Sequence, residues 1–215
     1  MMKQIIVFFS LLLYVSAFCQ INTEEIKNKV LENPKIYYYD YLEIFKMEPA
    51  KLTQQELNQM YYGSRFIESE YQMRDYNQDY EKIWKSAKLG MSKNKALKIV
   101  EDAQTKYNKN PLLKGIALEL SYIYKALGNK EKSNLYYLQN DLIDQTIENS
   151  GTGKSEDSPI CVIRAGDMIS KISSLPRASR PSDFKQEMTD LADGNILTTY
   201  SVGDSKIYIK LVGGF

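Results

Sequence analysis

The chain has 215 residues, 43% of them hydrophobic, and carries 28 lysines and arginines against 27 aspartates and glutamates. This composition suits one sizeable core or two small ones, and the near-neutral charge argues against a nucleic-acid partner, which requires clustered cations. The chain holds no histidine, which excludes Ser-His-Asp and Cys-His catalysis and, with only two cysteines, the common His or Cys zinc sites.

Residues 1–19, MMKQIIVFFSLLLYVSAFC, have the pattern of a secretory signal peptide. Lys3 precedes a short apolar run over residues 5–15, and Ala17 and Cys19 stand at the small-residue positions before a cleavage site. The apolar run is too short for a transmembrane helix. We therefore expect cleavage between Cys19 and Gln20 and a secreted or periplasmic mature chain without a transmembrane segment.

An alternative makes Cys19 the lipidated first residue of a lipoprotein, although Phe18 is bulkier than the residue that such processing prefers. Cleavage after Cys19 would leave Cys161 as the remaining cysteine in an oxidising compartment, so we expect no internal disulfide. We interpret Cys161, within the apolar stretch PICVI, as a small buried hydrophobic residue.

Helix start and stop signals recur from residue 22 to residue 150. Asn22 and Glu25 form a capping-box pattern for a helix that ends at residues 33–34, an Asn-Pro pair. A second helix follows in IYYYDYLEIF, and Thr53 and Glu56 form a capping box for a third. The expected inward-facing residues of the second and third helices are Tyr37, Tyr41, Ile44, Phe45, Leu57, Met60 and Tyr61.

After Gly63, residues 64–79 are polar and aromatic without clear periodicity, and we interpret them as a partly ordered connection. Two further helices are predicted, the first ending at Gly90 and the second at residues 110–111, another Asn-Pro pair. Their expected inward-facing residues are Tyr80, Ile83, Trp84, Ala87, Ala96, Ile99, Val100, Ala103 and Tyr107.

The next two helices are separated by Gly128 and Asn129. Their expected inward-facing residues are Leu113, Ile116, Ala117, Leu120, Tyr124 and Leu127 in the first, and Ser133, Tyr137, Leu138 and Leu142 in the second. The order of small, leucine, aromatic and glycine positions in ALELSYIYKALGNKEKSNLYY resembles the tetratricopeptide repeat, whose helical hairpins stack around a concave binding surface. We predict a mainly α fold, with a TPR-like helical hairpin stack over residues 20–150.

From residue 151 to residue 215 the pattern predicts a small α+β portion that docks on the helices. PICVIR suits a short strand, Asp167 is expected to cap one helix, and Ser182 is expected to cap another through Phe184, Met188 and Leu191. Alternating apolar residues over 196–202 and 207–211, with a Gly-Asp turn between them, predict a terminal β-hairpin.

The letters SGTGKS at residues 150–155 are similar to the end of an ATP-binding phosphate loop. Such a loop needs a glycine five positions before Gly153, where this chain has Glu148, and it connects a strand to a helix. Here a helical pattern precedes the motif, which makes Gly151 the expected helix cap and the motif an ordered turn. Nucleotide binding therefore stands as a minor alternative, and we expect no cofactor.

The chain resembles an uncharacterised family of secreted Bacteroidetes proteins that carry domain of unknown function 4919. The resemblance rests on MYYGSRF at residues 60–66 with Tyr71 following, on the SGTGKS turn, and on the terminal strand IYIKL. The family more often has Asp at the position of Thr152, and a proline where this chain has Met73. The resemblance implies an exported protein of this architecture and assigns no catalytic residue.

The seventeen tyrosines are more numerous than the other aromatic residues, and most fit as packing residues with the ring in the core and the hydroxyl at water. The functional interpretation is a non-catalytic module that binds a protein or peptide. The candidate binding residues are Tyr61, Tyr62, Arg65, Tyr71, Ser150, Gly151, Gly153 and Lys154. The alternative is a glycan hydrolase that uses two carboxylates among Glu68, Glu70 and Asp75.

Overall fold

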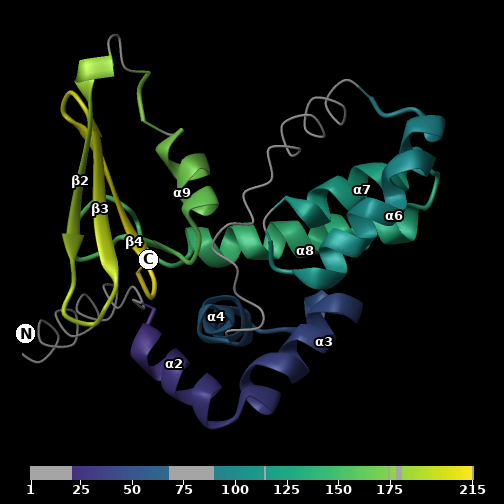
Figure 1. The fold of residues 1–215 in the computed structure, drawn as a ribbon, viewed down its shortest axis with the longest axis horizontal. Coiled ribbons are helices and arrows are strands. Elements are labelled where there is room, and N and C mark those ends of the chain that lie inside the picture. Colours follow the sequence, from purple (N-terminus) through teal and green to yellow (C-terminus); the bar gives the residue numbers. More distant parts are fainter. Residues whose placement is uncertain (1–20, 68–89, 114, 174, 178–180, 215) are drawn as a thin grey trace, which may run out of the picture.

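The computed structural model describes residues 21–67, 90–113, 115–173, 175–177 and 181–214. The described chain is mainly helical, with a small sheet formed largely by the C-terminal residues (Figure 1). The α-helices are α2 (Thr23–Glu32), α3 (Asp40–Met47), α4 (Gln54–Gly63), α6 (Lys93–Lys109), α7 (Ile116–Ala126), α8 (Lys130–Glu148) and α9 (Ala165–Ile172). The strands are β1 (Ile160–Val162), β2 (Phe184–Asp190), β3 (Ile196–Val202) and β4 (Ser205–Leu211).

Helices α2, α3 and α4 begin and end largely where local sequence signals place them. The Asn22 side chain accepts a hydrogen bond from the Glu25 backbone N–H at the start of α2, and Thr53 and Glu56 form the complete capping box of α4. These capping predictions are confirmed. None of the helices among the described residues is both long and apolar enough to traverse a bilayer.

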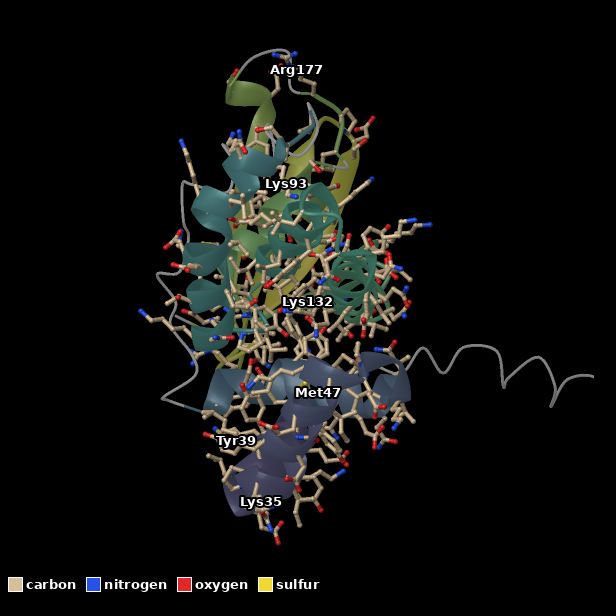
Figure 2. All side chains as sticks on the ribbon, turned by 90° about the vertical axis from the view of Figure 1, so that its right-hand side faces the viewer. Lys35, Tyr39, Met47, Lys93, Lys132 and Arg177 are labelled. Carbon is tan, nitrogen blue, oxygen red and sulfur yellow. The ribbon has the colours of Figure 1, made fainter. Side chains whose placement is uncertain are left out.

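A π-helical turn at Lys35–Tyr39 precedes α3 and changes which residues face the core. Of the predicted inward residues, Phe45 is buried as expected, but Tyr37 and Tyr41 are only half-buried and Ile44 is exposed. Tyr38 and Leu42 are buried in their place. The prediction assumed a uniform α-helical period, whereas a π turn inserts an extra residue and rotates the inward face. On the outer side of this layer Tyr39 and Met47 are exposed (Figure 2).

Helices α6, α7 and α8 pack side by side around a second cluster of buried residues. α6 ends at Asn110 as predicted, and α7 and α8 form a helical hairpin across Gly128, whose φ of +81° suits the turn, with Asn129 capping α8. The buried members of this cluster are Ala96, Ala103, Tyr107, Ile116, Ala117, Leu120, Ile123 and Tyr136.

The buried side of α8 includes Ser133, as predicted, but differs from the prediction further along the helix. Tyr137 was expected to face inward but is 56% exposed, whereas Tyr136, Gln139 and Ile143 are buried. The reason is that α8 runs through the middle of the molecule and contacts α7 along one part and α4 and β1 along another (Figure 1). A helix with partners on two sides buries polar residues that a single amphipathic stripe would leave in solvent.

The sheet has the strand order β1-β4-β3-β2, with β1 parallel to β4 and the other pairs antiparallel. The predicted strand at PICVIR and the predicted hairpin of β3 and β4 are confirmed. The helix predicted from Ser182 is wrong, because Phe184–Asp190 forms β2 and pairs with β3 along its whole length. Phe184 and Met188 are four residues apart, a spacing that puts two residues on one face of either a helix or a strand.

The prediction that Asp167 caps α9 is also wrong. α9 starts at Ala165, so Asp167 lies within the first turn, and its side chain is 2% exposed. One cluster of buried residues connects the sheet and α9 to α2, α3, α4 and the C-terminal half of α8. The strand-containing part and the helical layer therefore share a core in the described chain.

Candidate functional site

The SGTGKS segment forms an ordered turn between the end of α8 and β1. The Ser150 hydroxyl donates to the Ile147 carbonyl at 2.6 Å and accepts from the Cys161 backbone N–H at 2.8 Å. Gly151 was predicted to cap α8, but the cap is Asn149. What requires glycine at position 151 is space, because a Cβ there would lie 2.0 Å from the Pro159 carbonyl oxygen.

The backbone amides of the turn are engaged in bonds of the turn itself. The Thr152 N–H donates to the Ser158 hydroxyl at 3.0 Å, and the Gly153 N–H to the Ser158 carbonyl at 2.8 Å. The Gly153 carbonyl accepts from Tyr208 on β4 at 2.9 Å. A phosphate loop would present such amides to its ligand at the start of a helix, whereas here they are used and the turn leads into a strand.

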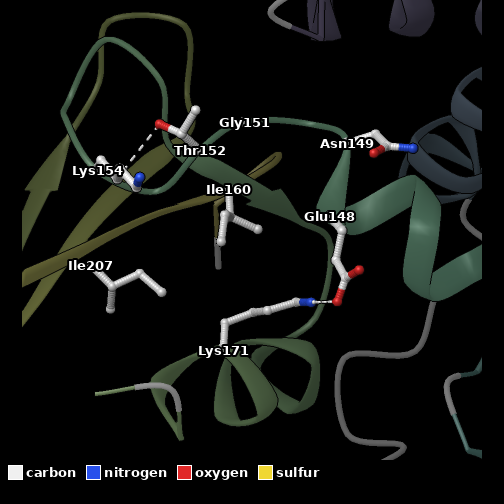
Figure 3. A pocket seen from close by; sticks show the side chains of 8 residues that line it. All are labelled: Glu148, Asn149, Gly151, Thr152, Lys154, Ile160, Lys171 and Ile207. Carbon is white, nitrogen blue, oxygen red and sulfur yellow. Dashed lines mark hydrogen bonds and ion pairs between the residues drawn. The ribbon is translucent and has the colours of Figure 1, made fainter. Parts of the chain in front are cut away.

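A pocket of about 530 Å³ opens beside this turn (Figure 3). We call it the turn pocket; it is lined by Glu148, Asn149, Gly151, Thr152, Lys154, Ile160, Lys171 and Ile207. Ile160 and Ile207 are the apolar residues of its wall. Lys171 on α9 forms an ion pair with Glu148 at 2.8 Å, while Lys154 is exposed on the turn. The pocket thus combines an apolar wall with two cations and one anion.

Tyr61 and Tyr62, on α4, lie in the core with their hydroxyl groups as well as their rings buried. The Tyr61 hydroxyl donates to the Asp167 carboxylate at 2.7 Å, and that of Tyr62 to the Cys161 carbonyl at 3.0 Å. Burial raises the pKa of both tyrosines well above the usual 10.0, and the charge of Asp167 adds to the shift for Tyr61. Neither tyrosine side chain lines the turn pocket. Tyr62 and Ser150 both bond to the backbone of Cys161, Tyr62 to its carbonyl and Ser150 to its N–H.

Arg65 lies apart from the turn pocket and holds the C-terminal loop. Its guanidinium donates to the carbonyls of Gly213 at 2.9 Å and Gly214 at 3.3 Å. It also lines a second pocket of about 640 Å³, together with Thr23, Glu24, Lys27, Phe66, Ala192, Asp193, Gly194, Asn195 and Gly213. Tyr71 and the carboxylate candidates Glu68, Glu70 and Asp75 fall outside the described residues.

A family model for the Domain of unknown function (DUF4919) matches residues 23–189. The chain belongs to this family. No curated protein and no solved structure matches the chain. The DUF4919 match extends from the start of α2 into β2, so it includes the SGTGKS turn, Tyr61, Tyr62 and Arg65.

The DUF4919 domain also contains buried polar residues that the sequence analysis did not single out. Arg164 is 4% exposed and reaches the Leu112 carbonyl and the Asn110 side chain, both at 3.4 Å, so it connects the end of β1 to the loop before α7. Gln139 is fully buried on α8, donates to the carbonyls of Phe45 and Lys46, and accepts from Tyr107. The position of Arg164, at the end of the apolar run PICVI, could have indicated it. Gln139 has no comparable sequence signal, because its partners come from distant parts of the sequence.

In the part of the chain that the structure describes, no group of three or more acidic, histidine or cysteine side chains is arranged to hold a metal ion. Among the described residues, buried polar contacts thus fix the helices against the sheet, and the turn pocket and the pocket beside Arg65 open at the surface.

Proposed function

We propose that the protein is an exported, non-catalytic binding module whose turn pocket holds a short segment of a peptide or protein partner. The observation that carries the proposal is the composition of this pocket. Ile160 and Ile207 offer an apolar wall, while Lys154 and Lys171 bring two positive charges against the single negative charge of Glu148. A volume of about 530 Å³ lies within the usual range of ligand pockets.

The charges favour a segment with an acidic residue beside an apolar one. Lys171 is paired with Glu148, which leaves Lys154 on the turn as the cation best placed for an incoming carboxylate. Ile160 and Ile207 are 8% and 7% exposed, so a leucine or isoleucine next to that acid would pack against the small part of each side chain that reaches the pocket.

The turn is a suitable platform because its conformation is fixed before any partner arrives. Gly151 packs against the Pro159 carbonyl, and Gly153 exchanges backbone hydrogen bonds with Ser158 and Tyr208. A preorganised site loses little conformational freedom on binding. The signal-peptide pattern of residues 1–19 supports export, and the repeat-like spacing in α7 and α8 supports a tetratricopeptide-like scaffold for the module.

The proposal is tested with an array of short peptides in which an acidic residue adjoins leucine or isoleucine. We expect saturable binding, with an affinity that falls about tenfold or more in Lys154→Glu, because the substitution replaces attraction between position 154 and the acidic residue of the peptide by repulsion. Lys98→Glu is the matched control, since Lys98 is an exposed lysine on α6 and does not line the pocket. Absence of binding to every peptide, or equal losses in both variants, would contradict the proposal.

A further inference from the structure

β2 forms an open edge of the sheet. It is the terminal strand in the order β1-β4-β3-β2, and all seven of its residues are exposed. Its register with β3 runs from Phe184 to Asp190 without a bulge, and the strand contains no proline. Among the described residues no segment pairs with its outer side. Long regular edges of this kind are templates for pairing with another strand.

The orientation of the β2 backbone follows from the turn that connects it to β3. The Leu191 N–H donates to the Asn195 carbonyl, so Leu191 points toward β3. In an antiparallel ladder successive residues point to alternate neighbours. The N–H and C=O groups of Phe184, Gln186 and Met188 therefore face the open side.

The side chains of Phe184 and Met188 continue the inner face of the sheet beyond the helices. They pair with Val202 and Thr198 on β3, and the Phe184 ring lies 5.8 Å from that of Tyr200, which is buried. Yet Phe184 is 38% exposed and Met188 is 49% exposed. This apolar surface lacks a cover in the described chain.

We propose that β2 pairs with β2 of a second copy of this chain, antiparallel about a twofold axis at Gln186, to form one continuous sheet. In this register Lys185 lies opposite Glu187 of the other copy twice, and Phe184 lies opposite Met188 twice. Both pairings are favourable across antiparallel strands. All backbone groups that face the open side between Phe184 and Met188 then find partners.

Neighbouring registers with the same backbone orientation are disfavoured by charge. Centring the axis on Glu187 would put two glutamates opposite each other, and centring it on Lys185 would do the same with two lysines. The sequence of β2 therefore selects one self-complementary register, which is what a symmetric interface requires.

Sedimentation equilibrium of the purified chain measures the dimer, and charge reversal tests the register. We expect Lys185→Glu and Glu187→Lys each to raise the dissociation constant about tenfold, because each turns two attractive pairs into repulsive ones. The double variant with both substitutions exchanges the charges and should restore the affinity of the original chain. A monomer at all concentrations, or a dimer insensitive to Lys185→Glu, would overturn the proposal.

Thiol crosslinking with a short bismaleimide is a second test of the register between the two β2 strands. Gln186→Cys would place the two thiols on strands whose Cα atoms are about 5.5 Å apart, so a crosslinked dimer should form. Asp190→Cys is the control, because its two copies would be about 27 Å apart along the strands. Both variants carry Cys19→Ser, and Cys161 is buried and contributes little background. Equal crosslinking at both positions would contradict the register.

Discussion

The hydrogen bond between Tyr61 and Asp167 connects helix α4 to helix α9 across 106 positions of sequence. Both side chains are almost completely buried, at 1% and 2% exposure. Tyr61→Phe removes the hydroxyl and keeps the ring, so Asp167 loses a donor at 2.7 Å without loss of packing. A buried hydrogen bond to a charged acceptor is worth about 2 kcal/mol, so the free energy of unfolding should fall by about that amount.

Chemical denaturation followed by circular dichroism measures this change, and the melting temperature should fall by roughly 4 to 8 °C. Tyr62→Phe is the matched comparison, because the neighbouring hydroxyl donates to the neutral Cys161 carbonyl and should contribute about 1 kcal/mol. Tyr39→Phe, at an exposed ring, should change little. The reasoning is refuted if Tyr61→Phe costs no more than Tyr39→Phe.

Three further perturbations probe packed or buried groups of the fold. Gly151→Ala should lower the free energy of unfolding by about 3 kcal/mol, because its Cβ would lie 2.0 Å from the Pro159 carbonyl oxygen. The control is Gly194→Ala, where φ is +78° and the space is open, and it should lower that free energy by about 1 kcal/mol. Equal losses in the two variants, measured by denaturant unfolding, would refute the steric argument. Gln139→Leu should lower the free energy of unfolding by about 3 kcal/mol, because it leaves the Tyr107 hydroxyl and two backbone carbonyls without their partner. The control Tyr137→Ala, at an exposed side chain, should lower it by less than about 0.5 kcal/mol. A loss at Gln139 no larger than that of the control would contradict this. Stability should fall as the pH rises above 10.0, because the raised pKa of Tyr61 and Tyr62 lets the unfolded chain release protons first; unchanged stability there would contradict their burial.

Local signals in the sequence predicted the elements whose ends are fixed by nearby residues. The side chains of Asn22 and Thr53 cap α2 and α4 through backbone groups three residues away, and Gly203 turns β3 into β4 with φ +57°. Such features depend on a few neighbouring residues, so they can be read without knowledge of the fold.

The features that could not be predicted depend on contacts between distant segments. β2 is a strand because β3 returns beside it after Leu191, although Phe184 and Met188 also fit a helix. Tyr61 and Asp167 meet only in the folded chain, so neither the aromatic cluster nor the presumed cap indicated their bond.

The candidate binding residues that the sequence indicated do not all lie together in the structure. Gly151 and Lys154 line the turn pocket, Arg65 lines a separate one, and Tyr61 and Tyr62 lie inside the core. A list of unusual residues could not separate those that face solvent from those that fix the scaffold, because that distinction rests on the packing of α8 against the sheet.

We propose that the turn pocket binds an acidic and apolar peptide segment. The most direct measurement is a titration of the isotopically labelled chain with a short peptide that joins leucine to glutamate, followed by amide chemical shifts in NMR spectra. We predict that the shifts that change with peptide concentration will cluster at Gly151, Lys154, Ile160, Lys171 and Ile207. Spectra that do not change, or changes confined to other parts of the molecule, would show that the turn pocket does not bind this peptide.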